Sequence, residues 1–393
     1  MTSKKNIAII IRTLNFKSET FLLNIIEIVS KECATIIYFE RGSKEDKNRL
    51  KNVKGVQRTI ELTPLNAVLS ILGKPLRAVK FWSQLNGTKK RKFLDLAILL
   101  NERIEVLYFP FGYNTTHREQ YGQVMNVGMA VSFMGSDLFV WPKTHNHDYT
   151  PLLKACRQIH CNSSALKKAA LDIQPTVSNK IRIIPSGLRR EFENIDLEDI
   201  QSIRKELYAQ SAEVITTVGR LNWIKGYEPI LFALADLRSK GYPFVYNIIG
   251  YGSEEEKLKL IAQKLGLEDS VVFHGYKNTT EIIDILKSST LYVQTSWSEG
   301  FSNSVLEAQA MGLYSVVTPV SGMNDIINFD YKGCILEDFN QGTLNTKMES
   351  LMNIESFEWR NSNANKIRQA TIQGFGFEVF KNNWLQFFKE SVK

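Results

Sequence analysis

The sequence contains few cysteines and no long apolar run. The four cysteines in 393 residues are Cys33, Cys156, Cys161 and Cys334. Their spacing fits no zinc site, and they are too few for the disulfide framework of a secreted domain. No apolar run approaches the roughly 20 residues of a membrane-spanning helix, and the run at residues 7–11 is too short for a signal peptide. We therefore expect a protein of the reducing cytosol with free thiols.

Acidic residues are scarce in the first half of the chain. Residues 1–190 carry 30 lysines and arginines against 14 acidic residues, whereas residues 191–393 carry 19 against 27. A basic half of this kind is attracted to an anionic surface, either a membrane or a nucleic acid. Because no nucleic-acid-binding motif accompanies the charge, we expect no nucleic-acid partner and favour an anionic membrane surface.

The strongest basic patch, residues 74–93, contains no acidic residue. Its cations are Lys74, Arg77, Lys80, Lys89, Lys90, Arg91 and Lys92. The apolar side chains of Leu76, Val79, Phe81 and Trp82 lie among them, a composition typical of segments in the headgroup layer of a bilayer. A solvated loop between two elements has the same charge pattern, and both interpretations stay open. The first predicts a peripheral position on the inner face of the cell membrane.

Apolar runs alternate with helical patterns along the chain. The predicted strands cover residues 7–11, 34–38, 56–62, 106–109, 130–133, 158–161, 181–184, 213–219, 244–250, 271–276, 290–294 and 315–318. Helical patterns, such as residues 18–31 and 227–240, separate them. This alternation predicts an α/β fold with parallel, doubly wound sheets, and the length predicts two domains. Ligands of such sheets bind at the carboxyl ends of the strands.

The most informative loop follows the strand at residues 290–294. It contains Glu299-Gly300-Phe301 and leads into a predicted helix at residues 303–311, with Asn303 or Ser304 as the capping residue. Free backbone N–H groups at the loop and the helix start, around Gly300, Phe301, Ser302 and Asn303, suit a phosphate. Glu299 and Glu307 flank this spot, and a carboxylate accepts hydrogen bonds from vicinal sugar hydroxyls. The combination indicates a nucleotide-sugar site.

A second loop supplies cations. Arg220 and Lys225 lie between a strand ending at Gly219 and the helix predicted at residues 227–240. Arginine offers a planar fork for phosphate oxygens and lysine a mobile point charge, so the pair suits a diphosphate. A further glycine turn begins at Gly250, but Glu255 stands where a dinucleotide-binding fingerprint needs its third glycine.

Together these motifs resemble glycosyltransferase family 4, the retaining group with the GT-B fold. Glu299-Gly300-Phe301 followed by Glu307-Ala308 resembles its paired-glutamate signature, and Gly219-Arg220-Leu221 followed by Lys225-Gly226 resembles its phosphate-binding loop. The resemblance covers nearly the whole chain, and it is strong over residues 218–325 and weaker before residue 162. Within this family the chain resembles members of bacterial polysaccharide biosynthesis.

The resemblance implies transfer of a hexose from a UDP- or GDP-linked sugar to a hydroxyl of a saccharide acceptor, lipid-linked and at the inner face of a bacterial membrane. Retention of configuration would follow from front-side attack, in which the donor phosphate takes the acceptor proton. By this resemblance Glu307 holds the ribose, Glu299 the donor sugar, and Arg220 and Lys225 the diphosphate, while Tyr276 borders the base pocket. No cofactor is implied. The absence of an Asp-x-Asp pattern leads us to expect no metal.

The acceptor side is predicted from two loops of the first half. Ser18 and Glu19 open a Ser-Glu-Thr-Phe sequence that resembles the acceptor-facing loop of polysaccharide-assembly members, although a helix cap at Ser18 explains it equally well. Asp137 fits a family stretch of the form His-Gly-x-Asp, in which Met134 replaces the histidine. Methionine neither donates a hydrogen bond nor takes a proton, so the role of that histidine is absent or filled otherwise.

The resemblance also implies the domain organisation. Two Rossmann-like domains, residues 1–190 and 191–374, would face each other across a cleft, with a final helix at about residues 375–393 returning to the first. A catalytically inactive GT-B scaffold that binds a nucleotide or a partner is the alternative function, favoured by Met134 and opposed by both glutamates, Arg220 and Lys225. An epimerase or phosphorylase of the same fold would be distinguished by its products.

Overall fold

The computed structural model describes residues 6–14, 20–84, 93–99, 102–196, 198–209 and 213–392. The chain divides into two units, each with its own sheet and hydrophobic core. The first consists of Met1–Pro185 and Phe380–Lys393, and the second of Ser186–Val379. The sequence-based boundaries, after residues 190 and 374, lie within five residues of these divisions.

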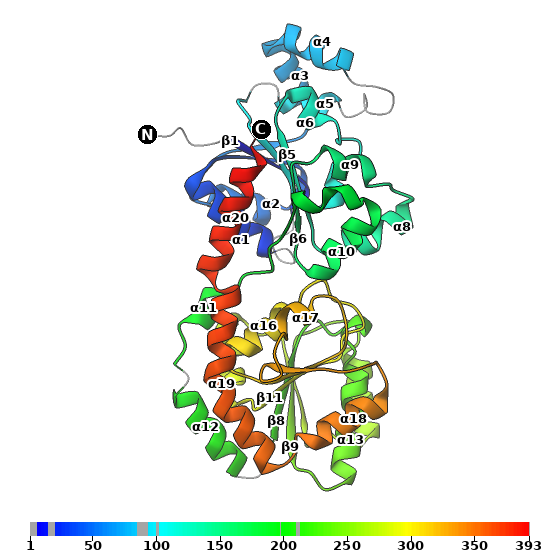
Figure 1. Cartoon of the computed structure of the whole chain (residues 1–393), viewed down its shortest axis with the longest axis vertical. Helices are drawn as coiled ribbons and strands as arrows, with labels where there is room; N and C mark the ends of the chain where they lie inside the picture. The colour runs from blue at the N-terminus through cyan, green and yellow to red at the C-terminus, as the bar shows by residue number, and fades with distance from the viewer. Residues whose placement is uncertain are drawn as a thin grey trace. The chain divides into compact units, whose positions relative to one another are not determined.

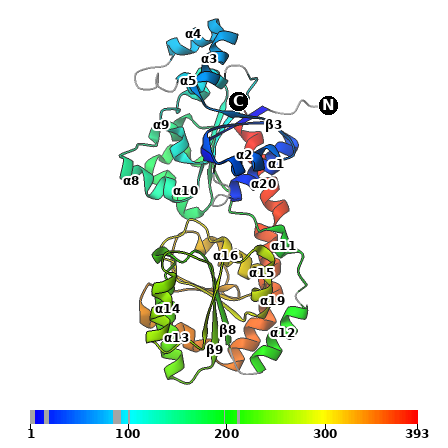
Figure 2. The ribbon, with the colours of Figure 1, turned by 180° about the vertical axis from the view of Figure 1, so that it is seen from behind.

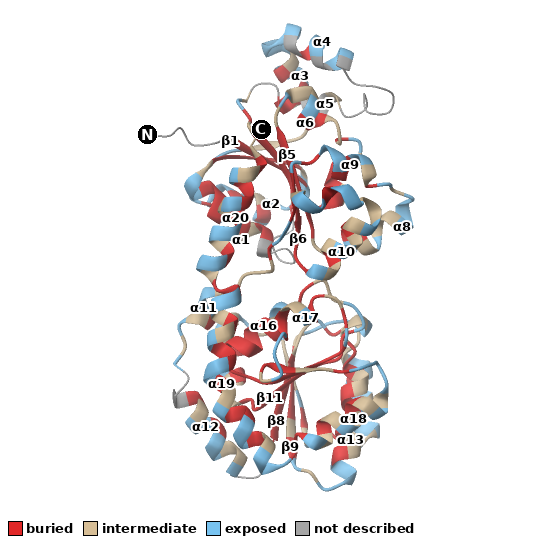
Figure 3. Ribbon diagram, viewed as in Figure 1, coloured by how far each residue is buried: buried red, intermediate tan, exposed pale blue. Residues whose placement is uncertain are grey.

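The first unit contains a seven-stranded parallel sheet with the order β3-β2-β1-β4-β5-β6-β7. The strands are β1 (Asn6–Leu14), β2 (Ala34–Gly42), β3 (Val56–Glu61), β4 (Val106–Phe109), β5 (Gly128–Phe133), β6 (Gln158–Cys161) and β7 (Ile181–Ile183). All seven strands predicted for this half are present. The apolar runs of the five inner strands are buried because helices cover both faces of a parallel sheet, as their colour in Figure 3 shows, whereas the edge strands β3 and β7 are partly exposed.

The described residues of the first unit form ten α-helices before β7. They are α1 (Thr20–Glu32), α2 (Lys44–Lys51), α3 (Pro64–Gly73), α4 (Pro75–Gln84), α5 (Phe93–Leu99), α6 (Tyr121–Met125), α7 (Ser136–Phe139), α8 (Trp141–His145), α9 (Thr150–Ala155) and α10 (Ser164–Ile173). In Figures 1 and 2, α1 lies on one face of the sheet and α9 and α10 lie on the other. Residues 75–84, for which a solvated loop was one interpretation, are helical.

The end of helix α20 (Phe377–Ser391) completes the core of the first unit. Trp384 is 1% exposed, and its ring centroid lies 4.6 Å from that of His160 and 5.9 Å from that of Tyr108. His160 is itself held between the Ser132 hydroxyl and the Ile184 carbonyl, and its burial lowers the pKa of the imidazole to about 4. The aromatic spacing near the C-terminus therefore reflects core packing, as the helical pattern predicted.

The second unit contains a six-stranded parallel sheet with the order β10-β9-β8-β11-β12-β13. The strands are β8 (Glu213–Val218), β9 (Phe244–Ile249), β10 (Val271–Gly275), β11 (Leu291–Gln294), β12 (Ser315–Val317) and β13 (Gly333–Ile335). The five strands predicted for this half are all present. The sixth strand, β13, was not predicted from the sequence.

The helices of the second unit flank this sheet (Figure 2). They are α11 (Arg190–Glu193), α12 (Glu198–Ala209), α13 (Tyr227–Ser239), α14 (Glu255–Lys264), α15 (Thr279–Ser288), α16 (Asn303–Ala310), α17 (Met323–Ile326), α18 (Gln341–Ser350) and α19 (Ile354–Phe375). A buried ion pair joins the start of the sheet to α19, because Arg360 Nη2 lies 2.7 Å from Glu213 Oε1. Within the described ranges, no helix has both the length and the apolar character to span a bilayer.

Candidate functional site

Three loops of the second unit meet at the carboxyl ends of β9, β8 and β11. These strands are neighbours in the sheet and run parallel, so the loops that follow them begin at the same edge. The loop after β8 carries Arg220 and Lys225, the loop after β9 starts at Gly250, and the loop after β11 carries Glu299. The structure therefore brings the two principal predicted motifs to one edge of the sheet.

Glycines allow these loops to approach each other closely. Gly250 has φ +144°, and a Cβ there would lie 1.8 Å from the carbonyl oxygen of Gly219. Gly226 has φ +64°, and a Cβ there would lie 2.0 Å from the carbonyl oxygen of Thr295. Any side chain at either position would both strain the backbone and collide with the neighbouring loop. The two glycines thus hold the β8 loop against the loops on either side of it.

Lys225 and Glu299 form an ion pair in the middle of this site. Lys225 Nζ donates to Glu299 Oε1, and the two side chains are only 19% and 11% exposed. The same carboxylate oxygen accepts from Gln294 Nε2 at 2.8 Å and from the Ser296 hydroxyl at 2.9 Å. Two residues predicted for one site from separate motifs are therefore in direct contact.

Gln294, which the sequence analysis did not select, connects Glu299 to helix α16. Its amide nitrogen donates to Glu299, while its Oε1 accepts from the hydroxyls of Ser302 at 3.1 Å and Ser304 at 2.9 Å. The side chain is 1% exposed, so these bonds fix its orientation. A polar residue at the carboxyl end of an otherwise apolar strand was the available signal.

Helix α16 begins at Asn303, as predicted, but its capping residue lies one position before the predicted candidates. Ser302, not Asn303 or Ser304, is the capping residue, because its hydroxyl accepts from the Val305 amide at 3.4 Å. The Ser304 hydroxyl is instead used by Gln294, and the Asn303 side chain is exposed. The amides of the first helical turn have no partner within a helix and carry partial positive charge, which favours an anion here.

Glu307 lies inside α16 and pairs with an arginine from a distant segment. Arg189 Nε lies 2.8 Å from Glu307 Oε1, and Arg189 Nη1 donates to the Thr279 hydroxyl at 2.6 Å. Glu307 is 8% exposed. Burial raises the pKa of its carboxyl, and the charge of Arg189 opposes that rise. Arg189 therefore occupies one oxygen of the carboxylate that was predicted to hold a ribose.

The remaining predicted residues differ in accessibility. Arg220 is exposed, and its guanidinium forms no ion pair within the described part of the chain. Tyr276 is 72% exposed, with its ring 6.0 Å from that of Tyr251. Phe301 is buried against Phe375, so its side chain packs in the core and supports the loop. Gly300 has no side chain and can contact a ligand only through its backbone.

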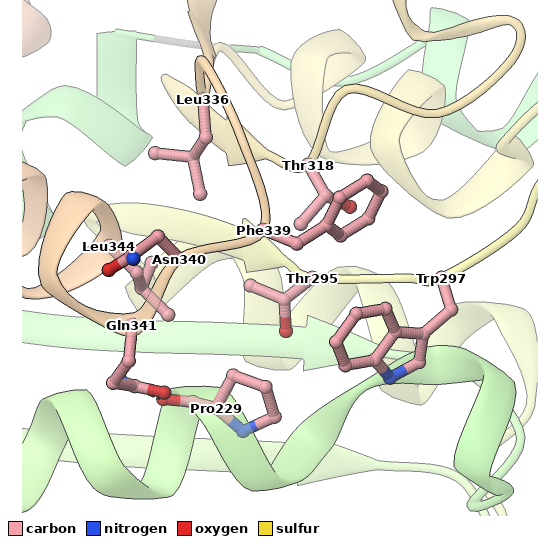
Figure 4. A pocket seen from close by; sticks show the side chains of 9 residues that line it. All are labelled: Pro229, Thr295, Trp297, Thr318, Leu336, Phe339, Asn340, Gln341 and Leu344. Carbon is pink, nitrogen blue, oxygen red and sulfur yellow. Dashed lines mark hydrogen bonds between the residues drawn. The ribbon is translucent and has the colours of Figure 1, made fainter.

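A small pocket lies behind the β11 loop (Figure 4). Thr295 and Trp297 from this loop line it together with Pro229 of α13 and residues of the segment leading into α18. The indole of Trp297 stacks on the Phe339 ring at 5.2 Å with an interplanar angle of 13°. None of the predicted donor-binding residues lines this pocket, so we assign it to the packing that supports the loop.

On the first unit, the predicted acceptor residue Asp137 is buried and holds two loops together. Its Oδ1 accepts from the amides of Met134 and Gly135, both at 2.9 Å, and its Oδ2 accepts from the Gly112 amide at 3.2 Å. These bonds join the loop after β5 to the loop after β4. Contact with an acceptor stays a prediction for Asp137, and Ser18 and Glu19 lie outside the described residues.

Asp137→Asn is expected to flatten the pH dependence of stability. Burial raises the pKa of Asp137 from 3.8 to about 6, opposed by its backbone hydrogen bonds, so the folded protein binds this proton more tightly than the unfolded chain does. The contribution of this carboxyl is therefore present below about pH 4 and is lost as pH rises through about 6, a change of about 3 kcal/mol. Urea unfolding of both proteins across this range measures it. A wild-type-to-variant difference that does not change with pH would contradict the assignment.

Comparison with known proteins agrees with this geometry. Residues 199–371 match the family described as glycosyl transferases group 1. An uncharacterized glycosyltransferase of Methanocaldococcus jannaschii, MJ1607, is 30% identical over 192 residues, 48% of this chain and 49% of that protein. The amylovoran biosynthesis glycosyltransferase AmsK of Erwinia amylovora is 30% identical over 197 residues, 48% and 46% of the two chains. This chain thus spans about half the length of the curated relatives it matches.

Solved structures are similar along the whole chain. The crystal structure of Anabaena Alr3699/HepE in complex with UDP has a TM-score of 0.73 at 14% identity and covers 98% of this chain and 99% of its own. The same protein in complex with UDP-glucose has a TM-score of 0.67 at 16% identity, with 98% and 99% coverage. The resemblance derived from the paired glutamates is confirmed: residues 199–371 match the family of group 1 glycosyl transferases, and the chain has the GT-B fold of two Rossmann-like units.

Proposed function

We propose that the protein is a retaining glycosyltransferase that moves a hexose from a UDP-linked sugar to a hydroxyl of a lipid-linked saccharide in the biosynthesis of a cell-surface polysaccharide. The observation that carries this proposal is the Lys225–Glu299 pair, which Gln294 holds beside the first turn of α16. The UDP and UDP-glucose complexes of a similar fold, and the amylovoran-biosynthesis relative, support the choice of donor and pathway class.

The site offers groups for each part of a nucleotide sugar. Arg220, Lys225 and the first-turn amides of α16 supply positive charge for the diphosphate, and the same charge stabilises the leaving nucleoside diphosphate as the sugar is transferred. Glu299 accepts from hydroxyls of the donor sugar. Glu307 accepts from the ribose hydroxyls when Arg189 yields one of its bonds.

We propose that these cations make a resident metal or cofactor unnecessary. In this scheme the attack occurs on the same face of the sugar from which the diphosphate departs. The acceptor oxygen forms a bond to the anomeric carbon while the bond to the diphosphate breaks, and the acceptor proton passes to a phosphate oxygen. The configuration at the anomeric carbon is thereby retained.

Calorimetric titration with UDP, GDP, ADP and TDP tests the donor assignment. We expect UDP to bind most tightly and Arg220→Ala to weaken that binding about tenfold or more, because a charged hydrogen bond to the diphosphate is lost. Arg238→Ala is the matched control, since Arg238 is an exposed arginine at the end of α13, outside the site. Failure of every nucleotide to bind to the folded protein would refute the transferase proposal.

Nucleotide binding without sugar transfer would favour the inactive scaffold instead. Donor turnover with a mixture of saccharide acceptors separates the two outcomes, and the configuration of the product identifies the mechanism as retaining or inverting. We place the reaction at the cytoplasmic face of the cell membrane, because the charge of the basic first half matches an anionic bilayer.

A further inference from the structure

Large apolar side chains are exposed on the consecutive helices α3 and α4, which are joined by Lys74 and together form the α3–α4 segment, residues 64–84. The exposed fractions are 68% for Leu65, 48% for Val68, 58% for Leu69, 72% for Leu72, 87% for Leu76, 67% for Val79 and 43% for Trp82. Single exposed leucines are common on proteins, but this many large apolar side chains exposed within one short segment mark an interaction surface. Figure 3 shows that α4 is mostly exposed.

The two helices expose their larger apolar side chains and bury smaller ones, which is the reverse of the usual pattern in soluble proteins. The leucines and valine of α3 recur at intervals of three and four residues and therefore share one face, which points outward. The inward faces of the two helices carry mainly small side chains, with Ala67 fully buried and Ala78 3% exposed, and the partly buried Ile71 packs beside them. The larger apolar surface thus faces solvent and the smaller one faces the core.

The charge around this face matches an anionic bilayer. Residues 62–94 contain no aspartate or glutamate, and Lys74 and Lys80 are exposed within the α3–α4 segment. Cations beside an apolar helical face are attracted to anionic lipid headgroups while the apolar side chains enter the acyl boundary. A second copy of this chain would bring the same cations against each other, and a nucleic acid would leave the leucines without an apolar partner.

We propose that the α3–α4 segment is a membrane-docking element whose outward apolar side chains insert into the headgroup region of an anionic bilayer. This rests on the proposed function in one respect, because it names the surface that would hold the enzyme where a lipid-linked acceptor resides. Docking itself requires no nucleotide sugar and no turnover, so it can be measured separately.

Co-sedimentation with vesicles tests the proposal. We expect the wild-type protein to bind vesicles of phosphatidylcholine and phosphatidylglycerol, and to bind vesicles of phosphatidylcholine alone more weakly. Leu72→Gln combined with Leu76→Gln is expected to lower the vesicle partition coefficient about tenfold or more, since two apolar side chains no longer enter the bilayer. Lys80→Gln should weaken binding to the anionic vesicles only, and high salt should do the same.

The controls separate docking from folding and from donor binding. Leu260→Gln replaces a leucine of α14 that is 49% exposed, and it should leave the partition coefficient unchanged. The double variant should retain the wild-type circular dichroism and UDP titration, so that a loss of vesicle binding is not a loss of fold or of the donor site. Wild-type protein that fails to bind anionic vesicles overturns the proposal. A double variant that binds them normally, or that changes only the oligomeric state, also overturns it.

Discussion

Lys225→Ala is expected to lower the rate of sugar transfer by about 10²- to 10³-fold, the usual effect of removing one preorganised group that stabilises charge in the transition state. The Lys225 ammonium group is the cation that the structure places directly on Glu299, at the loop where a diphosphate would depart. Its loss removes that charge and leaves Glu299, within the described part of the chain, with the neutral donors Gln294 and Ser296. Steady-state kinetics with the sugar nucleotide identified by titration measures the change.

The distribution of the effect between kcat and KM tests the assigned role. If Lys225 acts on the leaving diphosphate, most of the loss appears in kcat. Lys225→Arg keeps the charge and should recover part of the rate, whereas Lys240→Ala, a surface lysine of the same unit, should have no effect. A Lys225→Ala enzyme with wild-type kcat would show that the lysine only shapes the loop.

Arg360→Met is expected to lower the free energy of unfolding by about 3 to 5 kcal/mol, the typical cost of removing one member of a buried ion pair. Both Arg360 and Glu213 have side chains that are 2% exposed. Burial raises the pKa of Glu213 and the charge of Arg360 opposes the rise, so the variant leaves a carboxylate with the hydroxyl of Thr290 as a remaining donor. Urea unfolding followed by circular dichroism measures the loss.

The pH dependence and a double variant check this explanation. A buried carboxyl with a raised pKa is stable when protonated, so the deficit of Arg360→Met should grow as pH rises from the acidic range toward neutrality. Adding Glu213→Gln should restore part of the stability because no charge is then left uncompensated. Arg238→Met removes an exposed arginine of the same unit and should leave the unfolding midpoint unchanged. Equal deficits at all pH values would contradict the ion-pair explanation.

The strands and the main loops were predictable because each depends on local sequence. A continuous apolar run ending in Gly219 or Gln294 defines both a buried strand and the loop that follows it, so both loops were predicted at the carboxyl ends of strands, and the family resemblance placed Lys225 and Glu299 in one donor site. Arg189 was not predictable in this way, since it lies 118 residues from Glu307 and no local pattern connects them. The cap of α16 was placed wrongly because three adjacent polar residues compete for it, and only the structure shows that the Ser302 hydroxyl accepts from the Val305 amide.

The α3–α4 segment illustrates a different limit of prediction from sequence. Leu65, Val68, Leu69 and Leu72 show a helical interval in the sequence, but periodicity alone does not tell which face of a helix is covered. Only the burial of Ala67 and Ala78 fixes the leucines on the outside. The basic composition and the apolar side chains among the cations of α4 were therefore visible from the sequence, whereas the exposed apolar face of α3 required the three-dimensional arrangement.

The packing of Trp384 against β4 has a consequence for biosynthesis. Residues 380–391 supply part of the core around Tyr108 and His160, yet the ribosome makes them after the whole of the second unit. Residues 186–379 are contiguous and are available to fold as they emerge, while the unit that is translated first waits for its last helix. Until then its nascent sheet exposes apolar surface, so this protein should depend on chaperones that bind nascent chains more strongly than one whose domains are each continuous in sequence.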